Sequence, residues 1–423
     1  MEVFEIEGGK KLSGTIAVGG LKNAATPIIA ATLLTKERSV LENMPRIGDV
    51  FRMLEIVESM GVTVEWVGEQ TVAVTPGDFN PARIDQKKVK KLRSSILLLG
   101  ALSARFDQFT LEQPGGCVIG ARLVDAHIDA LQKLGVHIKM TEAGYVIDAT
   151  GRHSKKVVLK EMSVTATENA MLLASLLPGT TTIKVAACEP HVADLGVFLE
   201  KMGVGVTGAG THTITIEGCP ILKGGTHTIM PDHNEAATFL FLGVMTGSEI
   251  TVENAREDDL DIVLERLRLF GVEFTIKSNA ITVHPPEKIT AYQGKQIDTR
   301  TYPGIPTENQ SLFGVLATKA EGETLIFETM FEGRFNYASE LQKMGADLTI
   351  LNPHQMIVRG PTVLKGTVIK SFDLRAGVAL IIAALSATGK TIIEDVYQVD
   401  RGYERIEERL QGIGASIIRK EVS

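Results

Sequence analysis

The chain has 423 residues, of which 44% are hydrophobic and 22% are charged, a balance typical of folded globular proteins. The length suggests two or three domains. The net charge of −7 and the 5% share of aromatic residues argue against a nucleic-acid partner, because nucleic acids favour basic surfaces and aromatic stacking platforms. No apolar run is long enough to span a bilayer, and the N-terminus lacks a secretory core. We therefore expect a cytoplasmic protein with no membrane partner.

A helical segment that ends in glycine recurs six times along the chain. Neighbouring copies are 68 to 74 residues apart, and the glycines are Gly61, Gly135, Gly203, Gly271, Gly345 and Gly414. Glycine suits this position because a helix commonly ends on a left-handed residue. A β-like stretch follows each glycine, and each unit also holds an earlier, almost wholly apolar helix that predicts burial.

Each unit thus reads helix, strand, helix, strand. This order predicts an α/β (α+β) fold whose repeats gather around a core. A solenoid is the alternative, and we favour it less because these repeats are longer than is usual for solenoids.

The start of each buried helix carries polar or charged residues. They are Lys22, Asn23, Arg93, Thr165, Asp232, Glu308 and Asp373. Helix N-termini suit anions, so these positions are candidates for a phosphate-bearing ligand. The alternative is simple capping, which fits the acids and the apparent capping box at residues 165–168. Capping does not explain Lys22 and Arg93, because a cation there opposes the helix dipole.

The segment PGGCVIGAR at residues 114–122 is the sharpest local feature. Its three glycines and one proline predict an irregular loop around Cys117. Arg122 and the next helix start should lower the pKa of that thiol and raise its reactivity. The alternative is a small hydrophobic residue in a turn.

The other cysteines and the polar clusters give weaker signals. Cys188 and Cys219 lie in strand-like contexts and are read as structural, and the cysteine spacing gives neither a zinc motif nor a disulfide framework. Asp125, His127 and Asp129 share a predicted helix whose geometry disfavours a metal site. The basic run at residues 87–93 predicts a solvated helix face. Arg401 precedes a glycine and could reach a ligand, and His233 follows Asp232 at a helix start.

Several motifs in this order resemble the enolpyruvyl transferases, and most specifically the UDP-N-acetylglucosamine 1-carboxyvinyltransferase family. The resemblance covers essentially the whole chain. The segments that carry it are GLKNA at 20–24, KLRSS at 91–95, PGGCVIGAR with Asp125 and His127, YPGIPT at 302–307, FEGRF at 331–335, DLRA at 373–376 and DRGY at 400–403. The sister family that acts on shikimate 3-phosphate shares the fold but is not expected to carry the PGGC loop.

The resemblance implies a two-domain inside-out α/β barrel built from six βαβαββ-type units. Residues 22–230 would form one domain with the Cys117 lid loop, and residues 1–21 with 231–423 would form the other. The active site would lie between them. The resemblance implies no metal and no organic cofactor, and we expect a monomer.

The implied reaction moves the enolpyruvyl group of phosphoenolpyruvate to the 3′-hydroxyl of UDP-N-acetylglucosamine with release of phosphate. This is the first committed step of peptidoglycan precursor synthesis. The positions that match catalytic residues are Cys117 as the acid, Glu308 as the base, Asp373, Lys22 and Arg401. The positions that match substrate-binding residues are Lys22, Asn23, Arg93, Arg122, Leu123, Val124, Asp125, Ala126, Ser163, Val164, Glu308, Met330, Arg334, Arg375 and Arg401.

Four positions depart from the family's usual residues. Glu308 stands in place of Asp, Glu161 in place of Lys, Thr165 in place of Gly and His233 in place of Arg. These departures leave two alternatives open. The chain could be a weakly catalytic paralogue that binds a nucleotide sugar, or it could serve another acceptor.

Overall fold

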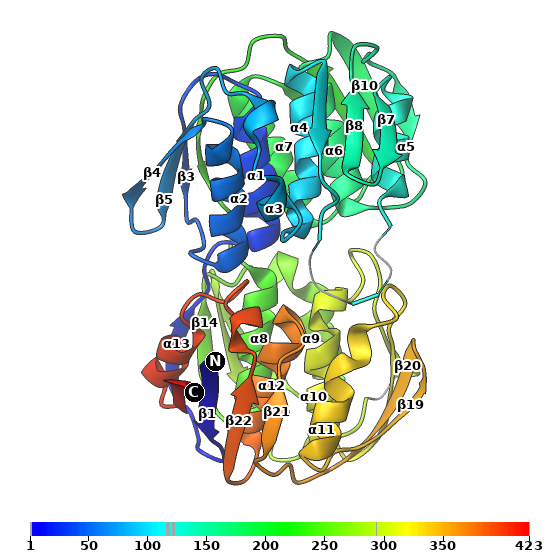
Figure 1. Cartoon of the computed structure of the whole chain (residues 1–423). Helices are drawn as coiled ribbons and strands as arrows, with labels where there is room; N and C mark the ends of the chain where they lie inside the picture. Colours follow the sequence, from blue (N-terminus) through cyan, green and yellow to red (C-terminus); the bar gives the residue numbers. More distant parts are fainter. Residues whose placement is uncertain (1, 116–118, 121–122, 293, 423) are drawn as a thin grey trace. The chain divides into compact units, whose positions relative to one another are not determined.

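The computed structural model describes residues 2–115, 119–120, 123–292 and 294–422, and these form two compact units (Figure 1). The terminal unit contains the chain up to Gly19, the short segment Ile119 and Gly120, and the chain from Pro231 onward. The central unit contains the chain from Gly20 to Gly115 and from Leu123 to Met230. The sequence had suggested a division at residues 22–230, and the observed division differs chiefly in assigning Ile119 and Gly120 to the terminal unit.

The central unit carries three sheets around a group of helices. The strand orders are β13-β3-β5-β4, β6-β8-β7 and β11-β12-β10-β9. The strands are β3 (Ser39–Glu42), β4 (Thr63–Gly68), β5 (Thr71–Thr75), β6 (Gln108–Leu111), β7 (His137–Thr141), β8 (Gly144–Asp148), β9 (Lys156–Val158), β10 (Gly179–Lys184), β11 (Gly205–Thr207), β12 (Thr213–Gly218) and β13 (Thr226–Thr228). The helices are α1 (Lys22–Thr32), α2 (Gly48–Ser59), η1 (Pro81–Arg83), α3 (Gln86–Val89), η2 (Arg93–Leu97), α4 (Leu98–Arg105), α5 (Asp125–Lys133), α6 (Val164–Ala174) and α7 (Pro190–Met202).

The terminal unit repeats this plan with the sheets β21-β22-β1-β23, β15-β16-β14-β2 and β17-β18-β20-β19. The strands are β1 (Glu2–Glu7), β2 (Gly14–Ala17), β14 (Ile250–Glu253), β15 (Glu273–Lys277), β16 (Ala280–His284), β17 (Ile297–Asp298), β18 (Gly322–Phe327), β19 (Asp347–Asn352), β20 (Gln355–Gly360), β21 (Val368–Lys370), β22 (Lys390–Glu394) and β23 (Ser416–Glu421). The helices are α8 (His233–Thr246), η3 (Glu257–Asp259), α9 (Asp261–Arg268), η4 (Thr307–Asn309), α10 (Gln310–Lys319), η5 (Arg334–Tyr337), α11 (Ala338–Lys343), α12 (Leu374–Ser386), η6 (Val396–Gln398) and α13 (Ile406–Gly412).

The repeat expected from the sequence is confirmed by the backbone. All six repeat glycines have a left-handed φ, between 86° and 104°. Each is followed by a strand of a sheet, and the described residues form six sheets in total. The N-terminal strands close two sheets of the terminal unit, since β1 pairs with β22 and β23 and β2 pairs with β14. The mixed α/β fold is therefore as the sequence predicted.

Each unit has its own hydrophobic core, built from the apolar helices. Residues 233–245 of α8 and 374–385 of α12 are buried without a gap, and the apolar runs at 236–245 and 376–385 predict this for most of each helix. The helices α1, α4 and α6 contact one another in the central unit, and α8, α10 and α12 do so in the terminal unit (Figure 1). Strands such as β4 and β15 leave alternate side chains exposed, so the sheets cover these helices on the outside. The repeats gather around two cores and do not stack as a solenoid.

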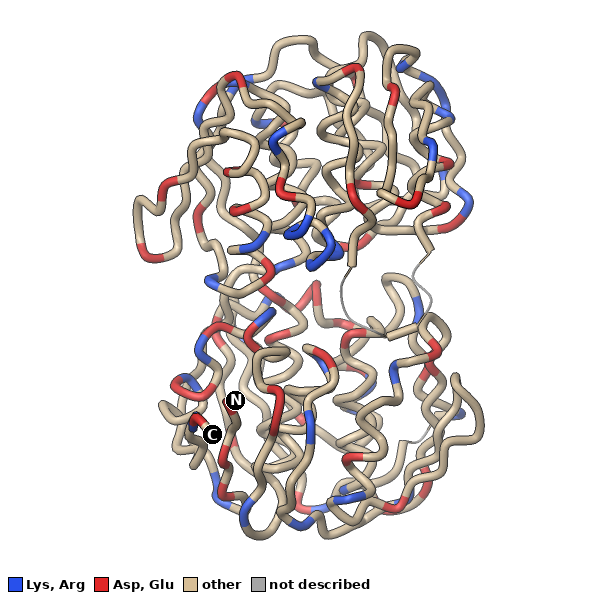
Figure 2. Tube along the Cα trace, viewed as in Figure 1, with Lys and Arg blue, Asp and Glu red and all other residues tan. Residues whose placement is uncertain are grey.

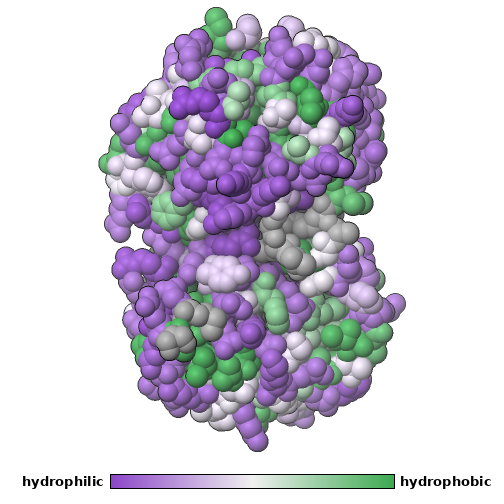
Figure 3. Space-filling view, viewed as in Figure 1, coloured by the Kyte–Doolittle hydropathy of each residue, from purple (hydrophilic) through white to green (hydrophobic). Residues whose placement is uncertain are grey.

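The visible face of the molecule is mainly hydrophilic, with apolar residues in separate spots (Figure 3). The exposed large hydrophobic residues come from different parts of the chain and include Ile221, Leu123 and Val363, which lie in loops. Within the described residues, no helix is both long and apolar enough to cross a membrane.

Candidate functional site

Two acids at helix starts act as N-caps. Asp373 Oδ1 accepts hydrogen bonds from the backbone N–H groups of Arg375 at 2.8 Å and Ala376 at 3.0 Å. Asp232 Oδ1 accepts from Asn234 at 2.8 Å and Glu235 at 3.0 Å. These bonds satisfy N–H groups that the helices leave free.

The capping box expected at residues 165–168 is wrong. The helix α6 begins earlier, and Ser163 is its N-cap, with its hydroxyl accepting from the Ala166 N–H at 3.4 Å. Thr165 therefore lies in the first turn, where its Oγ1 is 2.6 Å from His127 Nε2. Glu168 lies too far along the helix to bond back to the cap, and it is buried. Burial raises the pKa of Glu168 well above its ordinary value.

In the central unit, one group of predicted ligand-binding residues is brought together by the starts of η2, α5 and α6. Arg93 opens η2, and its Nη2 donates at 3.2 Å to the carbonyl of Leu123, two residues before the start of α5. Burial lowers the pKa of the Arg93 guanidinium. The 2.6 Å contact between His127 and Thr165 joins α5 to α6 and so brings the starts of these helices together. The residues concerned are Arg93, Leu123, Val124, Asp125, Ala126, Ser163 and Val164.

Lys22 and Asn23 open α1, which also contacts η2. The Lys22 ammonium is 3.2 Å from Asp49 Oδ2, and Asp49 is buried in the first turn of α2. This pairing explains how a cation is tolerated at a helix N-terminus. The charge of Asp49 offsets the unfavourable helix dipole.

The basic run before Arg93 lies largely in solvent, as its pattern predicts. Lys87, Lys90 and Lys91 are exposed, whereas Val89 and Leu92 are buried. Figure 2 shows basic residues gathered around this part of the central unit. Lys88 and Lys90 pair with Glu55 and Glu112, both in partly exposed ion pairs that contribute little to stability.

In the terminal unit, Asp373 is the centre of a second group. Asn336 Nδ2 donates to Asp373 Oδ2 at 2.9 Å, and Arg334 Nη1 lies 3.9 Å from Asp373 Oδ1. Arg334 Nε also donates to Thr307 Oγ1 at 3.1 Å, next to Glu308. The structure thus gathers Glu308, Arg334 and Asp373 from three separate segments of the chain.

Arg375 and Arg401 are linked through Tyr403. Arg375 Nη1 donates to the Tyr403 hydroxyl at 3.0 Å, and that oxygen is also 2.8 Å from Thr238 Oγ1. Arg401 lies two residues before Tyr403, and its Nη1 donates to Gln398 Oε1 at 3.2 Å. Tyr403 is 1% exposed, so its ring anchors the turn that carries Arg401.

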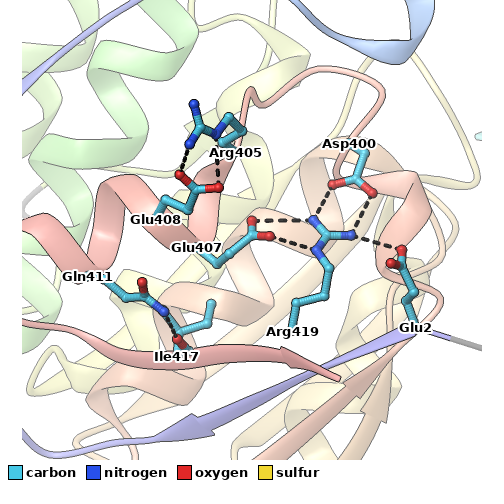
Figure 4. Close-up of polar contacts among 8 residues, drawn as sticks. All are labelled: Glu2, Asp400, Arg405, Glu407, Glu408, Gln411, Ile417 and Arg419. Carbon is cyan, nitrogen blue, oxygen red and sulfur yellow. Dashed lines mark hydrogen bonds and ion pairs between the residues drawn. The ribbon is translucent and has the colours of Figure 1, made fainter. Parts of the chain in front are cut away.

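The same turn is held on its other side by Arg419 of β23 (Figure 4). The guanidinium bonds to both oxygens of Asp400, at 2.9 and 2.7 Å, and to both oxygens of Glu407, at 2.6 and 3.3 Å. It also bonds to Glu2 of β1 at 3.0 Å. These two-point contacts fix the guanidinium plane and the carboxylates around it.

His233 is the first residue of α8, and its side chain is 9% exposed. Burial lowers the pKa of His233 to about 4, against an opposing effect of the Glu308 carboxylate. The imidazole is therefore neutral at physiological pH. The Asn234 side-chain amide donates to His233 Nε2 at 3.4 Å, which places the imidazole proton on Nδ1.

Two predicted site residues, Cys117 and Arg122, lie outside the described residues. Between them, the Ile119 carbonyl accepts from the Gly333 N–H at 2.9 Å. Gly333 directly precedes Arg334. This contact ties the middle of the segment to the part of the terminal unit that carries Met330 and Arg334.

The expected strand context is wrong for Cys188. Cys188 lies in the loop between β10 and α7, and Cys219 directly follows β12. Cys188 Sγ is 3.9 Å from His212 Nε2, and His212 Nδ1 donates to the Ala186 carbonyl at 2.9 Å. Burial raises the pKa of the Cys188 thiol, which keeps it protonated and supports a structural role. Among the described residues, no group of three or more His, Cys, Asp or Glu side chains could hold a metal ion.

Sequence reasoning missed several residues that hold the predicted ones in place. They are Asp49, Thr307, Glu328, Asn336, Tyr403 and Arg419. Their local patterns resemble those of ordinary surface or core residues. Only Thr307 and Tyr403 stood inside quoted motifs, and no spacing rule connected them with Arg334 or Arg375.

The family model for EPSP synthase (3-phosphoshikimate 1-carboxyvinyltransferase) matches residues 6–410. Proteins named UDP-N-acetylglucosamine 1-carboxyvinyltransferase are also similar over almost the full length. The protein from Actinobacillus succinogenes is 40% identical over 99% of both chains. The protein from Koribacter versatilis is 41% identical over 99% of this chain and 96% of its own.

Solved structures show the same fold. The enolpyruvyl transferase NikO from Streptomyces tendae is 25% identical, with a TM-score of 0.88 over 100% of this chain and 99% of its own. EPSP synthase from Acinetobacter baumannii matches the fold with a TM-score of 0.75 at 20% identity over 100% of both chains. The chain belongs to the carboxyvinyltransferase (enolpyruvyl transferase) family. Within it, the proteins at about 40% identity are those named for UDP-N-acetylglucosamine.

Proposed function

We propose that this chain transfers the enolpyruvyl group of phosphoenolpyruvate to the 3′-hydroxyl of UDP-N-acetylglucosamine and releases phosphate. The observation that carries the proposal is the 40% identity over 99% of the chain to proteins named for this reaction. The product would enter peptidoglycan precursor synthesis at its first committed step.

The chemistry needs one acid and one base. The sugar oxygen attacks C2 of phosphoenolpyruvate while the methylene carbon gains a proton, and the double bond re-forms when phosphate and a methyl proton leave. Cys117 occupies the position of the acid, and Glu308 occupies the position of the base for the sugar hydroxyl. Glu308 is the second residue of the short helix η4, and its carboxylate interacts electrostatically with the neutral His233 and the cationic Arg375.

The substrates carry several negative charges, which the cations would bind. Lys22, Arg122 and Arg401 are assigned to the phosphate and carboxylate of phosphoenolpyruvate. The Arg401 position is supported by the turn that Tyr403 and Arg419 hold on its two sides. A pre-set guanidinium loses less conformational freedom when it binds an anion.

The remaining matched positions are assigned to the nucleotide sugar. Arg93 and the α5 start, at Leu123, Val124, Asp125 and Ala126, would contact the uridine and diphosphate together with Ser163 and Val164. Asn23, Met330, Arg334 and Arg375 complete the set. Asp373 would act near the reacting centre, where Asn336 and Arg334 orient its carboxylate.

Phosphate release with phosphoenolpyruvate and UDP-N-acetylglucosamine, singly and together, tests the proposal. Release only with both substrates is expected. Binding of the nucleotide sugar without release would favour a weakly catalytic paralogue. Release only with a different nucleotide sugar would favour another acceptor, which the unusual Glu161, Thr165 and His233 keep as the second candidate.

A further inference from the structure

A buried chain of hydrogen bonds runs behind Glu308 in the terminal unit. Arg334 Nε donates to Thr307 Oγ1 at 3.1 Å, and Thr307 Oγ1 donates to Glu328 Oε2 at 2.9 Å. The other oxygen, Glu328 Oε1, accepts from the backbone N–H groups of Met330 at 2.8 Å and Phe331 at 3.1 Å. Glu328 is 0% exposed, and Thr307 and Arg334 are 7% and 9% exposed.

The hydrogen bonds of Thr307 can each run in one direction only when Glu328 is ionised. A guanidinium only donates, so the Thr307 hydroxyl must accept from Arg334 and donate its single proton to Glu328. Both oxygens of Glu328 face donors, so the group is bound as an acceptor-only carboxylate, although burial raises its pKa. Arg334 is therefore the donor at one end of the series, Glu328 is the acceptor at the other, and the Thr307 hydroxyl joins them.

These hydrogen bonds connect three pieces of the proposed active site. Thr307 and Glu308 are neighbours in η4, Met330 lies two residues after Glu328, and Arg334 opens η5 beside Asp373. In the sequence, the turn that carries Glu308 is separate from the segment that carries Met330 and Arg334. A shift of Glu328 would move both the turn that carries Glu308 and the loop that carries Met330.

We propose that Glu328 and Thr307 are positioning residues that fix the Glu308 carboxylate and the Met330–Arg334 loop in one geometry. The proposal rests on the proposed function, because it treats Glu308 as the base. It adds two residues to which the comparisons and the sequence motifs give no role. The carboxylate of Glu328 acts through Thr307 and the two backbone N–H groups and does not touch substrate.

Two substitutions at Thr307 form a matched pair. Thr307→Val keeps the shape and removes the hydroxyl, so Arg334 Nε and Glu328 Oε2 each lose one hydrogen bond, whereas Thr307→Ser keeps the hydroxyl. Because small displacements of reacting groups carry large rate penalties, we expect Thr307→Val to lower kcat about tenfold or more. Thr307→Ser should retain kcat within about threefold, and the KM for UDP-N-acetylglucosamine should change less than kcat in both.

The substitution Glu328→Gln gives a second, independent test of the proposal. If its oxygen stays on the two backbone N–H groups, its amide nitrogen faces Thr307 and leaves the hydroxyl proton without an acceptor. If the amide turns round, the backbone N–H groups lose theirs. In either orientation the Met330 and Phe331 N–H groups lose the charged oxygen that accepts their hydrogen bonds. Hydrogen exchange measured by mass spectrometry should therefore be faster in the peptide that contains these two residues, together with a fall in kcat.

Glu340→Gln is the matched control, since Glu340 is a carboxylate of the same unit with 2% exposure. It accepts from Lys343 Nζ at 2.9 Å and from the Lys370 backbone N–H at 3.0 Å. Its kcat should equal that of the wild type. The proposal is overturned if Thr307→Val turns over as fast as Thr307→Ser, or if Glu340→Gln loses as much kcat as Glu328→Gln.

The exchange measurement separates this proposal from the proposed function. An inactive wild-type protein would overturn the assigned reaction. Faster exchange around Met330 in Glu328→Gln would still support the positioning role, and unchanged exchange there would overturn it.

Discussion

Arg419 on the last strand makes a two-point ion pair with Asp400, the residue directly before Arg401 (Figure 4). Arg419 also bonds Glu407 and Glu2, so its guanidinium joins β1, α13 and the turn at Asp400. Its side chain is 23% exposed, which places the network between a solvated surface pair and a buried one. The position of Arg401 therefore depends on a residue 18 positions further along the chain.

Replacing Arg419 by Gln should weaken binding of phosphoenolpyruvate. Asp400 and Glu407 would lose their shared cation, and the turn that carries Arg401 would gain freedom. We expect the KM for phosphoenolpyruvate to rise about tenfold, which corresponds to about 1.4 kcal/mol. Arg419→Lys should recover only part of the loss, because an ammonium cannot reproduce the planar two-point contact.

The matched control for this change is Arg359→Gln. Arg359 also lies on a strand of the terminal unit and bonds two carboxylates, Glu323 at 2.7 Å and Asp347 at 3.4 Å. It should leave the KM unchanged. Equal KM values for Arg419→Gln and Arg359→Gln would show that Arg419 does not position Arg401.

Glu308→Gln should lower kcat more than it weakens substrate binding. The amide keeps the size of the side chain but cannot take a proton from the sugar hydroxyl. A loss of about a hundredfold in kcat is expected for removal of a general base. Glu308→Asp keeps the basic group and should lose less. Titration calorimetry with UDP-N-acetylglucosamine should give similar affinities for all three proteins, and an unaltered kcat in Glu308→Gln would remove Glu308 as the base.

Cys117→Ser should abolish modification by the epoxide fosfomycin, because we expect Cys117 to be the reactive thiol of the chain. Intact-mass spectrometry should show one adduct on the wild type and none above background on the variant. The double variant Cys188→Ser/Cys219→Ser is the control, because it keeps Cys117 alone and should gain the full adduct. An unchanged mass shift in Cys117→Ser would place the reactive thiol elsewhere.

His233 should make the protein less stable in mild acid. Its folded pKa of about 4 lies below the value near 6.5 of an exposed histidine, so below pH 6.5 the unfolded chain binds a proton that the folded chain does not. Stability should therefore fall as the pH drops from 6.5 towards 4, and at pH 5 this single group costs about 2 kcal/mol.

Urea unfolding at pH 7.5 and pH 5 measures this contribution. The loss of stability between the two pH values should be about 2 kcal/mol smaller in His233→Gln than in the wild type, because glutamine does not titrate. Identical losses in the two proteins would mean that His233 titrates with an ordinary pKa in the folded state.

The sequence by itself determined the repeat, the helices and the class of the fold. Gly203 and its five counterparts end helices because only glycine adopts a left-handed conformation without a steric penalty, and this rule acts locally. The apolar runs of α8 and α12 determine burial in the same way, since no face of either helix is polar enough for solvent. The motifs around Lys22, Arg93 and Asp373 could likewise be recognised from the sequence without the structure.

Only the tertiary structure decided which residues support those motifs. Local pattern placed the cap of α6 at Thr165, but two candidate hydroxyls lay within three residues, and the path of the chain selected Ser163. Glu328 and Arg419 lie in no recognised motif, and the motif that contains Thr307 gives it no role. Each of the three depends on a side-chain partner that is distant in the sequence. Hydrogen bonds of this kind depend on distances that the fold creates after the helices and strands have formed, and no local rule of sequence specifies them.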